Sequence, residues 1–560
     1  MARPTTASQA DGATRIEPIR VAVADYAGGH THTVDVPPLK EFASNPRVKS
    51  VPVDTGFIVL NPVTYPTFLR FLDQLNVPLT KSDMSFAVSR DLGEFEWAGD
   101  TLMTLFAQTR NLVDFSRDGM WIMLWDVLRF HWVAAQIADA ADKVTFSPQT
   151  ASDDDRTLFT KYKDMSIGDF LIEGAFSPSF RDNFLVPQTA AIWSTPAGSC
   201  IADFPILRLI SFFRNHRMLQ LVGRPRWLTV ALGSREYVKR ITQQLPDVRL
   251  RTAIRSVTRI GRADGRVSVN LTDVHGSEQT FDHVILATHG DISRQLIQDP
   301  STEETEVLSK VRYTKNRAVL HRDPALMPKT RATWSSWNYL TSTGKDGRSD
   351  SSDVCVTYWM NRLQPFIPRQ THGDIFLTIN PLYEPDPTLV IDEYEYDHPV
   401  YDFDLVQAQE QLHTISNKNG IGFAGAWENY CFHEDGCTSG LSAATALGAT
   451  PPFDLHLNGG YPTHRKLQEP VPGFPLVPNP DEYLSSLGHL LPVGYTLNSR
   501  KHAVTARPWR PRTRHVVDMS VWQVALQTLI LIIGHVTPKA LVRQLPRASA
   551  DCFLDQSRAG

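Results

Sequence analysis

The sequence has few cysteines and almost no excess of charge of either sign. Five cysteines are spread over 560 residues without a regular framework, which argues against a disulfide-stabilised secreted protein. The formal net charge is -4, so there is no electrostatic case for binding a nucleic acid. The N-terminus also lacks the charged-then-apolar pattern of a signal peptide. We therefore predict an intracellular protein that does not bind nucleic acid.

Residues 1–18 lack an apolar pattern, and their small and polar side chains predict disorder. The rest of the chain is different, because hydrophobic residues make up 42% of the whole sequence. A large core is therefore expected, and the length of 560 residues allows two or three domains.

Apolar residues recur with helical or strand periodicity between residues 21 and 448. Helices are predicted over 65–75, 120–141, 166–173, 205–221 and 234–245, and strands over 21–24, 53–60, 248–250, 256–260, 267–271, 283–287, 318–321, 354–359 and 375–379. Ser166 is expected to be the N-cap of its helix. Asp153, Asp154 and Asp155 are expected to lie in a solvated loop. The mixture of both periodicities indicates an α/β fold.

Residues 425–440 are the most informative part of the chain. The apolar residues 421–426 have the small side chains of a buried parallel strand, and 441–447 are good helix formers. Between them, Asp435 and Gly436 open the helix. A helix start presents free backbone N–H groups and a positive dipole end, which suits a phosphate or an electron-rich ring.

Other stretches of the sequence belong with this segment, because all of them resemble parts of one protein family. They are Gly28-Gly29-His30, Asp54-Thr55-Gly56, and residues 82–86, 190–194, 224–227, 287–289, 335–339 and 357–362. Together with residues 425–440 they resemble the FAD-dependent amine-oxidase-like superfamily, in its branch of predicted NAD/FAD-binding proteins. The resemblance extends over roughly residues 26–448.

The resemblance implies an α/β fold with an incomplete FAD-binding Rossmann-like domain, an inserted α+β substrate domain and a C-terminal helical tail. The implied cofactor domain is discontinuous and covers 19–60, 225–290 and 415–448. The implied substrate domain covers 61–224 and 291–414, and 449–560 forms a linker and tail.

The resemblance also implies a site for FAD. Its expected cofactor-binding residues are Gly28, Gly29, His30, Asp54, Thr55, Gly56, Ile254, Ala287, Thr288, Gly425, Ala426, Glu434, Asp435 and Gly436. Ile254 takes the place of an apolar residue against the adenine, and Ala287-Thr288 ends a strand close to the cofactor. Glu434 and Asp435 are also candidates to cap the motif helix.

The chain departs from the family at its start. An FAD-binding fold of this type begins with a strand, a Gly-x-Gly-x-x-Gly turn, a helix and a second strand that ends in an acidic residue. Residues 1–27 contain no such glycine spacing, and Ala22 stands at the position of the acid. A mis-assembled gene model, alternative splicing or degeneration would each explain this. We expect weak or absent FAD binding by the chain as written, since backbone N–H groups for the pyrophosphate are missing.

A literal match to the glycine pattern, residues 420–425, is rejected as a phosphate loop. It precedes and forms a strand, whereas a phosphate loop links a strand to a helix. A tight entry into the strand is the better interpretation.

The tail has a different character from the rest of the chain. Eight prolines make 449–480 a poorly helical linker, and 516–536 is the longest apolar stretch, with arginines and lysines on both sides. Its length is close to that of a bilayer span, but Asp518, Gln523, Gln527 and His535 weaken a simple span. The basic flanks favour a helix at a membrane surface, while a span and a packed soluble helix stay open.

No catalytic acid or base is assigned from the sequence. Tyr358, Trp359, Tyr430 and His433 are candidates to line the site, although a structural role is expected more often for each. Cys431, His433 and Cys437 lack the paired close spacing of a zinc site, so no metal is expected. The sequence thus predicts an FAD-dependent oxidoreductase that acts on an amine or an apolar, lipid-like small molecule. The alternative is a non-catalytic remnant that only binds.

Overall fold

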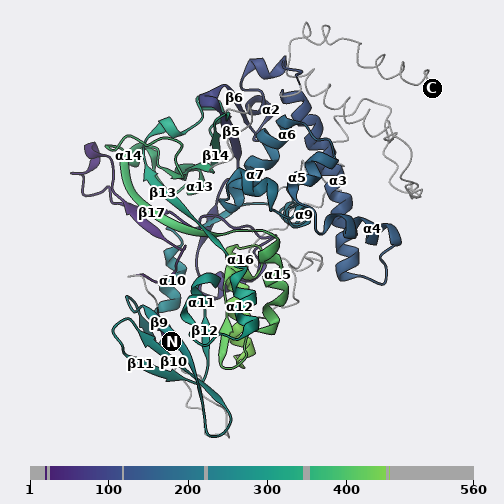
Figure 1. Cartoon of the computed structure of the whole chain (residues 1–560). Helices are drawn as coiled ribbons and strands as arrows, with labels where there is room; N and C mark the ends of the chain where they lie inside the picture. Colours follow the sequence, from purple (N-terminus) through teal and green to yellow (C-terminus); the bar gives the residue numbers. More distant parts are fainter. Residues whose placement is uncertain are drawn as a thin grey trace. The chain divides into compact units, whose positions relative to one another are not determined.

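The computed structural model describes residues 19–21, 26–116, 119–219, 225–344, 354–449 and 453, all within one compact unit formed by residues 1–484. The described residues form a mixed α/β structure, which confirms the predicted fold class (Figure 1). None of the helices in these ranges combines the length and apolarity needed to cross a bilayer. The predictions for residues 1–18 and 516–536 concern segments outside the described residues.

The largest sheet has seven strands in the order β17-β13-β16-β15-β14-β5-β6. They are β5 (Phe86–Arg90), β6 (Phe95–Ala98), β13 (Tyr313–His321), β14 (Trp337–Thr341), β15 (Cys355–Trp359), β16 (Phe376–Ile379) and β17 (Val390–Pro399). Neighbours are antiparallel except β14 and β5, which are parallel. The predicted strands at 318–321, 354–359 and 375–379 are confirmed. β5, β6, β14 and β17 were not predicted.

The helices between β6 and β7 pack into one layer beside this sheet (Figure 1). They are α2 (Leu102–Leu105), α3 (Met120–Phe146), α4 (Asp153–Tyr162), α5 (Ile167–Glu173), α6 (Pro178–Phe180), α7 (Val186–Trp193), α8 (Ala197–Ala202) and α9 (Ile206–Asn215). Phe130, Phe170 and Phe213 lie buried in their common core. The Ser166 hydroxyl accepts a hydrogen bond from the Asp169 N–H at 3.1 Å, which confirms the predicted N-cap of α5.

The prediction of a loop at residues 153–155 is wrong, because these acids form the first turn of α4. Ser152 accepts from the Asp155 N–H, and the Asp155 carboxylate accepts from the Ser152 N–H in return. This capping box, and the affinity of carboxylates for a helix N-terminus, offset the local charge density. The helix predicted over 205–221 also ends early, at Asn215.

The remaining strands form small sheets that join distant parts of the chain. β1 (Ile19–Val21) runs parallel to β8 (Asp247–Arg249), and β12 (Val284–Leu286) runs parallel to β18 (Ile421–Phe423). Antiparallel pairs join β2 (Thr33–Val36) with β3 (Val51–Asp54), and β4 (Leu79–Lys81) with β7 (Leu228–Val230). β9 (Ile254–Gly261), β10 (Val267–Asp273) and β11 (Glu278–Phe281) form an antiparallel sheet. The predicted strand at 53–60 is confined to β3, whereas those near 248, 256, 267 and 283 are confirmed.

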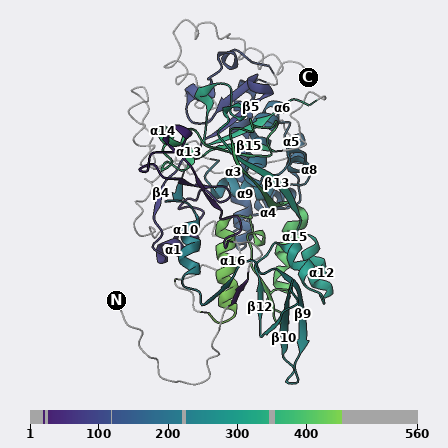
Figure 2. The same cartoon turned by 90° about the vertical axis from the view of Figure 1, so that its left-hand side faces the viewer.

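Further helices surround these sheets. They are α1 (Pro66–Gln74), α10 (Arg235–Thr242), α11 (Gly290–Leu296), α12 (Thr302–Ser309), α13 (Met360–Leu363), α14 (Arg369–His372), α15 (Phe403–Gln411) and α16 (His433–Ala446). α16 packs against α1, and it lies near α10 and β12 (Figure 2). The three segments expected to form the cofactor domain therefore contact one another, while the exact domain boundaries stay a prediction.

Candidate functional site

The loop between β18 and α16 is packed tightly against the first turns of the helix. The Gly425 N–H donates to the Ser439 hydroxyl at 2.9 Å, and this hydroxyl lies 3.2 Å from the Gly425 carbonyl oxygen. A Cβ atom on Gly425 would lie 2.5 Å from the Trp427 ring. A Cβ added at Gly436 would only make ordinary contact with Ala426, at 3.7 Å. Close approach therefore requires a glycine at 425 but not at 436.

The two acids of this segment serve as caps inside the protein. The Glu434 carboxylate accepts from the N–H groups of Thr67 and Phe68, at 2.9 and 2.8 Å, and so caps α1. The Asp435 carboxylate accepts from the Phe432 N–H at 2.8 Å and caps its own helix. Burial raises the pKa of Glu434 to about 7 and that of Asp435 well above its ordinary value.

Two polar atoms of the same loop are buried and make no hydrogen bond to any described residue. They are the indole Nε1 of Trp427 and the Oε1 of Glu428. Burial also raises the pKa of Glu428 to about 8. A buried donor and a buried acceptor one residue apart leave hydrogen bonds to be made by a bound group that carries hydroxyls.

The N-terminal glycines form an exposed turn and a close crossing. Gly28 and Gly29 have φ angles of 127° and 57°, and a Cβ on Gly29 would meet no atom within 4 Å. A Cβ on Gly56 would lie only 2.0 Å from the His30 carbonyl oxygen, which accepts the Phe57 N–H. Gly56 is thus required by close approach. The carbonyl oxygens of Gly28 and Gly29 accept hydrogen bonds from the Thr31 N–H and the Tyr26 hydroxyl, at 2.9 and 3.0 Å, so the turn is held by its own residues although both glycines are exposed.

Asp54 and Thr55 are bonded to protein groups. The buried Asp54 carboxylate accepts from the N–H and hydroxyl of Ser234, from Thr33 and from the Gln364 amide. Burial raises the pKa of Asp54 to about 6, against the effect of these donors. The Thr55 hydroxyl lies 2.7 Å from the Tyr396 hydroxyl. Both residues join the N-terminal segment to neighbouring elements.

The remaining expected cofactor residues, Ile254, Ala287 and Thr288, lie at the start of β9 and just after β12. Ile254 begins β9 and packs, half-buried, against the large core cluster that includes Val257, Val269 and Leu286. Ala287 follows β12 and is exposed, and the Thr288 hydroxyl lies 2.8 Å from that of Ser293.

His433, the first residue of α16, contacts the N-terminal segment directly. Its ring stacks on Phe57 at 3.8 Å between centroids, and its Nε2 lies 2.5 Å from the Tyr237 hydroxyl and 3.2 Å from that of Thr31. Burial, and the nearby His30, lower its pKa to about 3. His433 is therefore a neutral ring that contacts residues from the two other segments expected to form the cofactor domain.

Beside this junction the predicted residue His30 lies in a histidine cluster with His289, from the family-like stretch 287–289, and with His398, which the sequence analysis missed. The His30 ring centroid lies 5.9 Å from that of His289 and 5.5 Å from that of His398. His289 stacks on Tyr313 at 4.2 Å, and Tyr396 lies 5.1 Å from His30. The alternating sequence from Tyr394 to His398 was the available signal for this strand.

The imidazoles of the histidine cluster are neutral at neutral pH. Burial, together with the neighbouring His289, lowers the pKa of His30 to about 4. Burial and the two other rings lower the pKa of His398 to about 3, and burial lowers that of His289. Among the described residues no group of three side chains is arranged to hold a metal ion. The cluster is therefore a neutral, aromatic and half-buried group, in which His30 and His289 meet His398 of β17.

The aromatic candidates from the sequence have structural contacts. Tyr358 is buried and packs edge-on against Trp337, and the Trp359 indole donates to Asp374 at 3.0 Å. Tyr430 is buried, and its carbonyl oxygen accepts from the Trp193 indole. None of these three lies in the histidine cluster.

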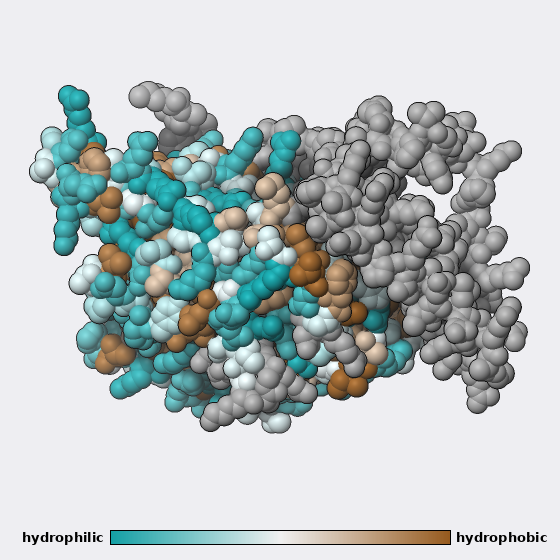
Figure 3. Space-filling view, turned by 90° about the horizontal axis from the view of Figure 1, so that it is seen from above, coloured by the Kyte–Doolittle hydropathy of each residue, from teal (hydrophilic) through white to brown (hydrophobic). Residues whose placement is uncertain are grey.

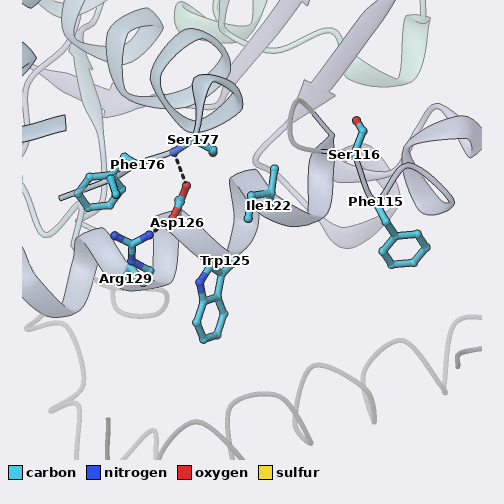
Figure 4. A pocket seen from close by; sticks show the side chains of 9 residues that line it. Phe115, Ser116, Ile122, Trp125, Asp126, Arg129, Phe176 and Ser177 are labelled. Atoms are coloured by element: carbon cyan, nitrogen blue, oxygen red, sulfur yellow. Dashed lines mark hydrogen bonds and ion pairs between the residues drawn. The ribbon is translucent and has the colours of Figure 1, made fainter. Parts of the chain in front are cut away.

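Two surface pockets lie away from the histidine cluster. One, of about 210 Å³, lies between the start of α3 and residues 175–177, with Trp125, Arg129 and Phe176 in its wall (Figure 4). The other, of about 450 Å³, lies between the end of α1 and α10. The surface in Figure 3 is mostly hydrophilic, with hydrophobic residues in small groups. Neither pocket contains a residue of the expected cofactor site.

Comparison with known proteins gives one family and a common fold. The family described as flavin-containing amine oxidoreductase matches residues 24–448. Cyclohexylamine oxidase from Brevibacterium oxydans IH-35A is 13% identical, with a TM-score of 0.50 over 77% of this chain and 92% of that chain. A redesigned putrescine oxidase has the same identity and TM-score, over 77% and 93%. At this identity the likeness shows the fold alone. No curated protein matches the sequence.

Proposed function

Because the chain belongs to the flavin-containing amine oxidoreductase family, we propose that it is an FAD-dependent oxidoreductase acting on an amine or an apolar, lipid-like small molecule. The observation that carries this proposal is the junction at His433. There the start of α16, the Gly28–Gly29 turn region and α10 come into contact beside the histidine cluster.

The residues of the junction fit an FAD molecule. Gly28 and Gly29 are exposed, and because their carbonyl oxygens are bonded within the turn, it is backbone N–H groups that they can offer to a phosphate. The unpartnered Trp427 Nε1 and Glu428 Oε1 suit hydroxyl groups of the cofactor. When bound, FAD supplies the hydride acceptor, and the protein supplies binding and orientation. The histidines and tyrosines around His30 carry no formal charge themselves, which suits an apolar part of a substrate, while the carboxylate of Asp397 is near enough to raise the pKa of His30 and His289.

The alternative of a non-catalytic remnant rests on residues 1–27. These contain no Gly-x-Gly-x-x-Gly turn, and Ala22 cannot bond a ribose hydroxyl as an acid would. Such a chain would retain a binding surface without turnover. Binding of FAD without any reduction by substrate is the result that would favour this alternative.

Substrate-driven reduction of the flavin tests the proposal. The purified full chain is supplied with FAD under anaerobic conditions, and a panel of amines and apolar molecules is added while flavin absorbance is followed. Bleaching by a member of the panel is expected. FAD that stays oxidised with every member, although a chemical reductant bleaches it, would contradict the enzymatic proposal.

Membrane association through residues 516–536 stays a prediction that supports a lipid-like substrate. The basic flanks and apolar centre of that stretch are its only support. Fractionation of the full chain beside a version that ends at Leu447 measures it. Recovery of the full chain with membranes, and of the shorter version in the supernatant, is expected.

A further inference from the structure

The strand β17 carries its functional side chains on a single face. Along Tyr394-Glu395-Tyr396-Asp397-His398 the aromatic residues alternate with acids, as the pleat of a strand requires. The register places His398 opposite Thr314 and Tyr396 opposite Asn316 on β13. His398 and Asn316 are therefore diagonal neighbours on the face that meets His30, while the acids face the other way.

A chain of amide hydrogen bonds on this face ends at His398. The Arg317 backbone N–H donates to the Asn380 Oδ1 at 2.9 Å, and the Asn380 Nδ2 donates to the Asn316 Oδ1 at 2.7 Å. The Asn316 Nδ2 then donates to the His398 Nδ1 at 2.9 Å. Because a backbone N–H can only donate, the first bond fixes the orientation of Asn380 and hence of Asn316.

This chain of bonds determines which ring nitrogen of His398 carries the proton. A neutral imidazole has one donor and one acceptor nitrogen, and Nδ1 accepts from Asn316. The proton is therefore on Nε2. Within the described residues Nε2 makes no hydrogen bond, and the half-buried His398 has its ring centroid 5.5 Å from that of His30. His398 thus presents an unused, oriented N–H beside the histidine cluster.

We propose that His398 Nε2–H is a substrate-binding hydrogen-bond donor, and that it selects molecules with an uncharged oxygen acceptor, such as a carbonyl, over ammonium ions. This inference rests on the proposed oxidoreductase function, and it deepens that proposal by choosing the apolar, oxygen-bearing substrate over the amine. An ammonium finds no acceptor at Nε2–H itself, because an N–H can only donate, and it would have to rely on the more distant field of Asp397, which also acts on His30 and His289. Asn316 and Asn380 are positioning residues, since they act through His398.

The tautomer is the first test and needs no ligand. The full chain is labelled with ¹⁵N-histidine, and long-range ¹H–¹⁵N spectra are recorded at neutral pH. The His398→Gln variant assigns the resonance by its loss, and His275→Gln, an exposed turn residue, serves as the control. A neutral ring protonated at Nε2 is expected. A neutral ring protonated at Nδ1, or an imidazolium, would overturn the proposal.

Reversal of the amide bond is the second test. In Asn316→Asp the new carboxylate accepts from Nδ1–H, so we expect the proton to move to Nδ1 and the pKa of His398 to rise by about one unit or more. An unchanged Nε2–H spectrum in a folded variant would show that Asn316 does not set the tautomer. If this variant does not fold, the wild-type tautomer still decides the proposal.

Substrate selection is tested with two probes of equal chain length, octanamide and octylamine. Octanamide is expected to shift the His398 resonance and to bind about tenfold more weakly to His398→Gln, the loss of one hydrogen bond. Octylamine is expected to shift nothing. Binding of octylamine alone, or of neither probe, would overturn the selection. Failure of the oxidoreductase proposal would look different. In that case no substrate would reduce the bound flavin, although His398 would still be protonated at Nε2.

Discussion

The motif region, residues 425–440, and the edge strand β17 both bring polar side chains to the same junction, but they hold them differently. In the motif region, Glu434 and Asp435 are saturated with backbone N–H groups of the protein itself. On β17, His398 is bonded at Nδ1 only, and within the described residues Nε2 has no partner. In the motif region the carboxylates therefore bind helix N-termini of the protein itself, whereas on β17 one N–H of His398 has no partner among the described residues.

This difference suggests two roles: the motif residues hold the structure together, and His398 is the proposed ligand-binding residue. The motif residues that stand out in the sequence keep α16, α1 and the loop in place, and among its polar side chains only Trp427 and Glu428 have buried atoms without partners. The residue with an oriented, unused donor lies instead on a strand with no family fingerprint. Substitutions in the two regions should therefore affect different properties, namely stability in the first and ligand recognition in the second.

The largest expected effect belongs to Gly56→Ala, in the scaffold around His30. The new Cβ would lie 2.0 Å from the His30 carbonyl oxygen, so the backbone must move. We expect a loss of about 3 kcal/mol or more in the free energy of unfolding. Urea denaturation measures it, with Gly440→Ala as the matched control, because Gly440 is exposed in α16 with no atom within 4 Å of a Cβ. The control should gain about 0.5–1 kcal/mol.

A smaller loss is expected for Glu434→Ala. Removal of the carboxylate leaves the N–H groups of Thr67 and Phe68 without their cap, so we expect a destabilisation of about 2–4 kcal/mol. Glu434→Gln, which keeps one acceptor, should lose less. Equal stability of the alanine variant and the wild type in thermal unfolding would show that these caps do not hold the motif helix to α1.

The ionisation of Glu434 adds a pH dependence that sharpens the same point. Its pKa is raised in the folded state from 4.5 to about 7, so the folded chain binds more protons than the unfolded chain between these values. Stability should therefore fall as the pH rises through this window. Asp54 and Glu428, also raised, act in the same direction. In Glu434→Gln the fall measured by urea unfolding should be shallower, and an identical slope would contradict the assignment.

The smallest effect on stability is expected for His398→Gln. The side chain is bonded to the protein at one ring nitrogen, so its removal should cost about 1 kcal/mol or less. Calorimetry beside Glu434→Ala makes the contrast direct. A loss at His398 as large as that at Glu434 would mean that β17 is scaffold too, and the comparison of the two regions would fail.

The sequence predicted the parts of the fold that depend on local patterns. Buried strands at β15 and β16 and the Ser166 N-cap follow from apolar runs and capping chemistry. The loop predicted at residues 153–155 was wrong because the prediction considered only their charge density and not the capping box with Ser152. The histidine cluster required tertiary structure, since His30, His289 and His398 come from three separate segments. Their meeting leaves no local signal apart from the alternation in β17.

The most direct test of the account is a titration of FAD into the purified full chain, followed by flavin fluorescence. The account predicts saturable binding of one FAD per chain. The binding should be weak enough to need added FAD, because residues 1–27 offer no glycine turn for the pyrophosphate. In Gly425→Ala, whose Cβ would lie 2.5 Å from the Trp427 ring, binding should weaken further, while Gly440→Ala should bind like the wild type. The absence of any saturable FAD binding by the folded wild-type chain would contradict the central claim.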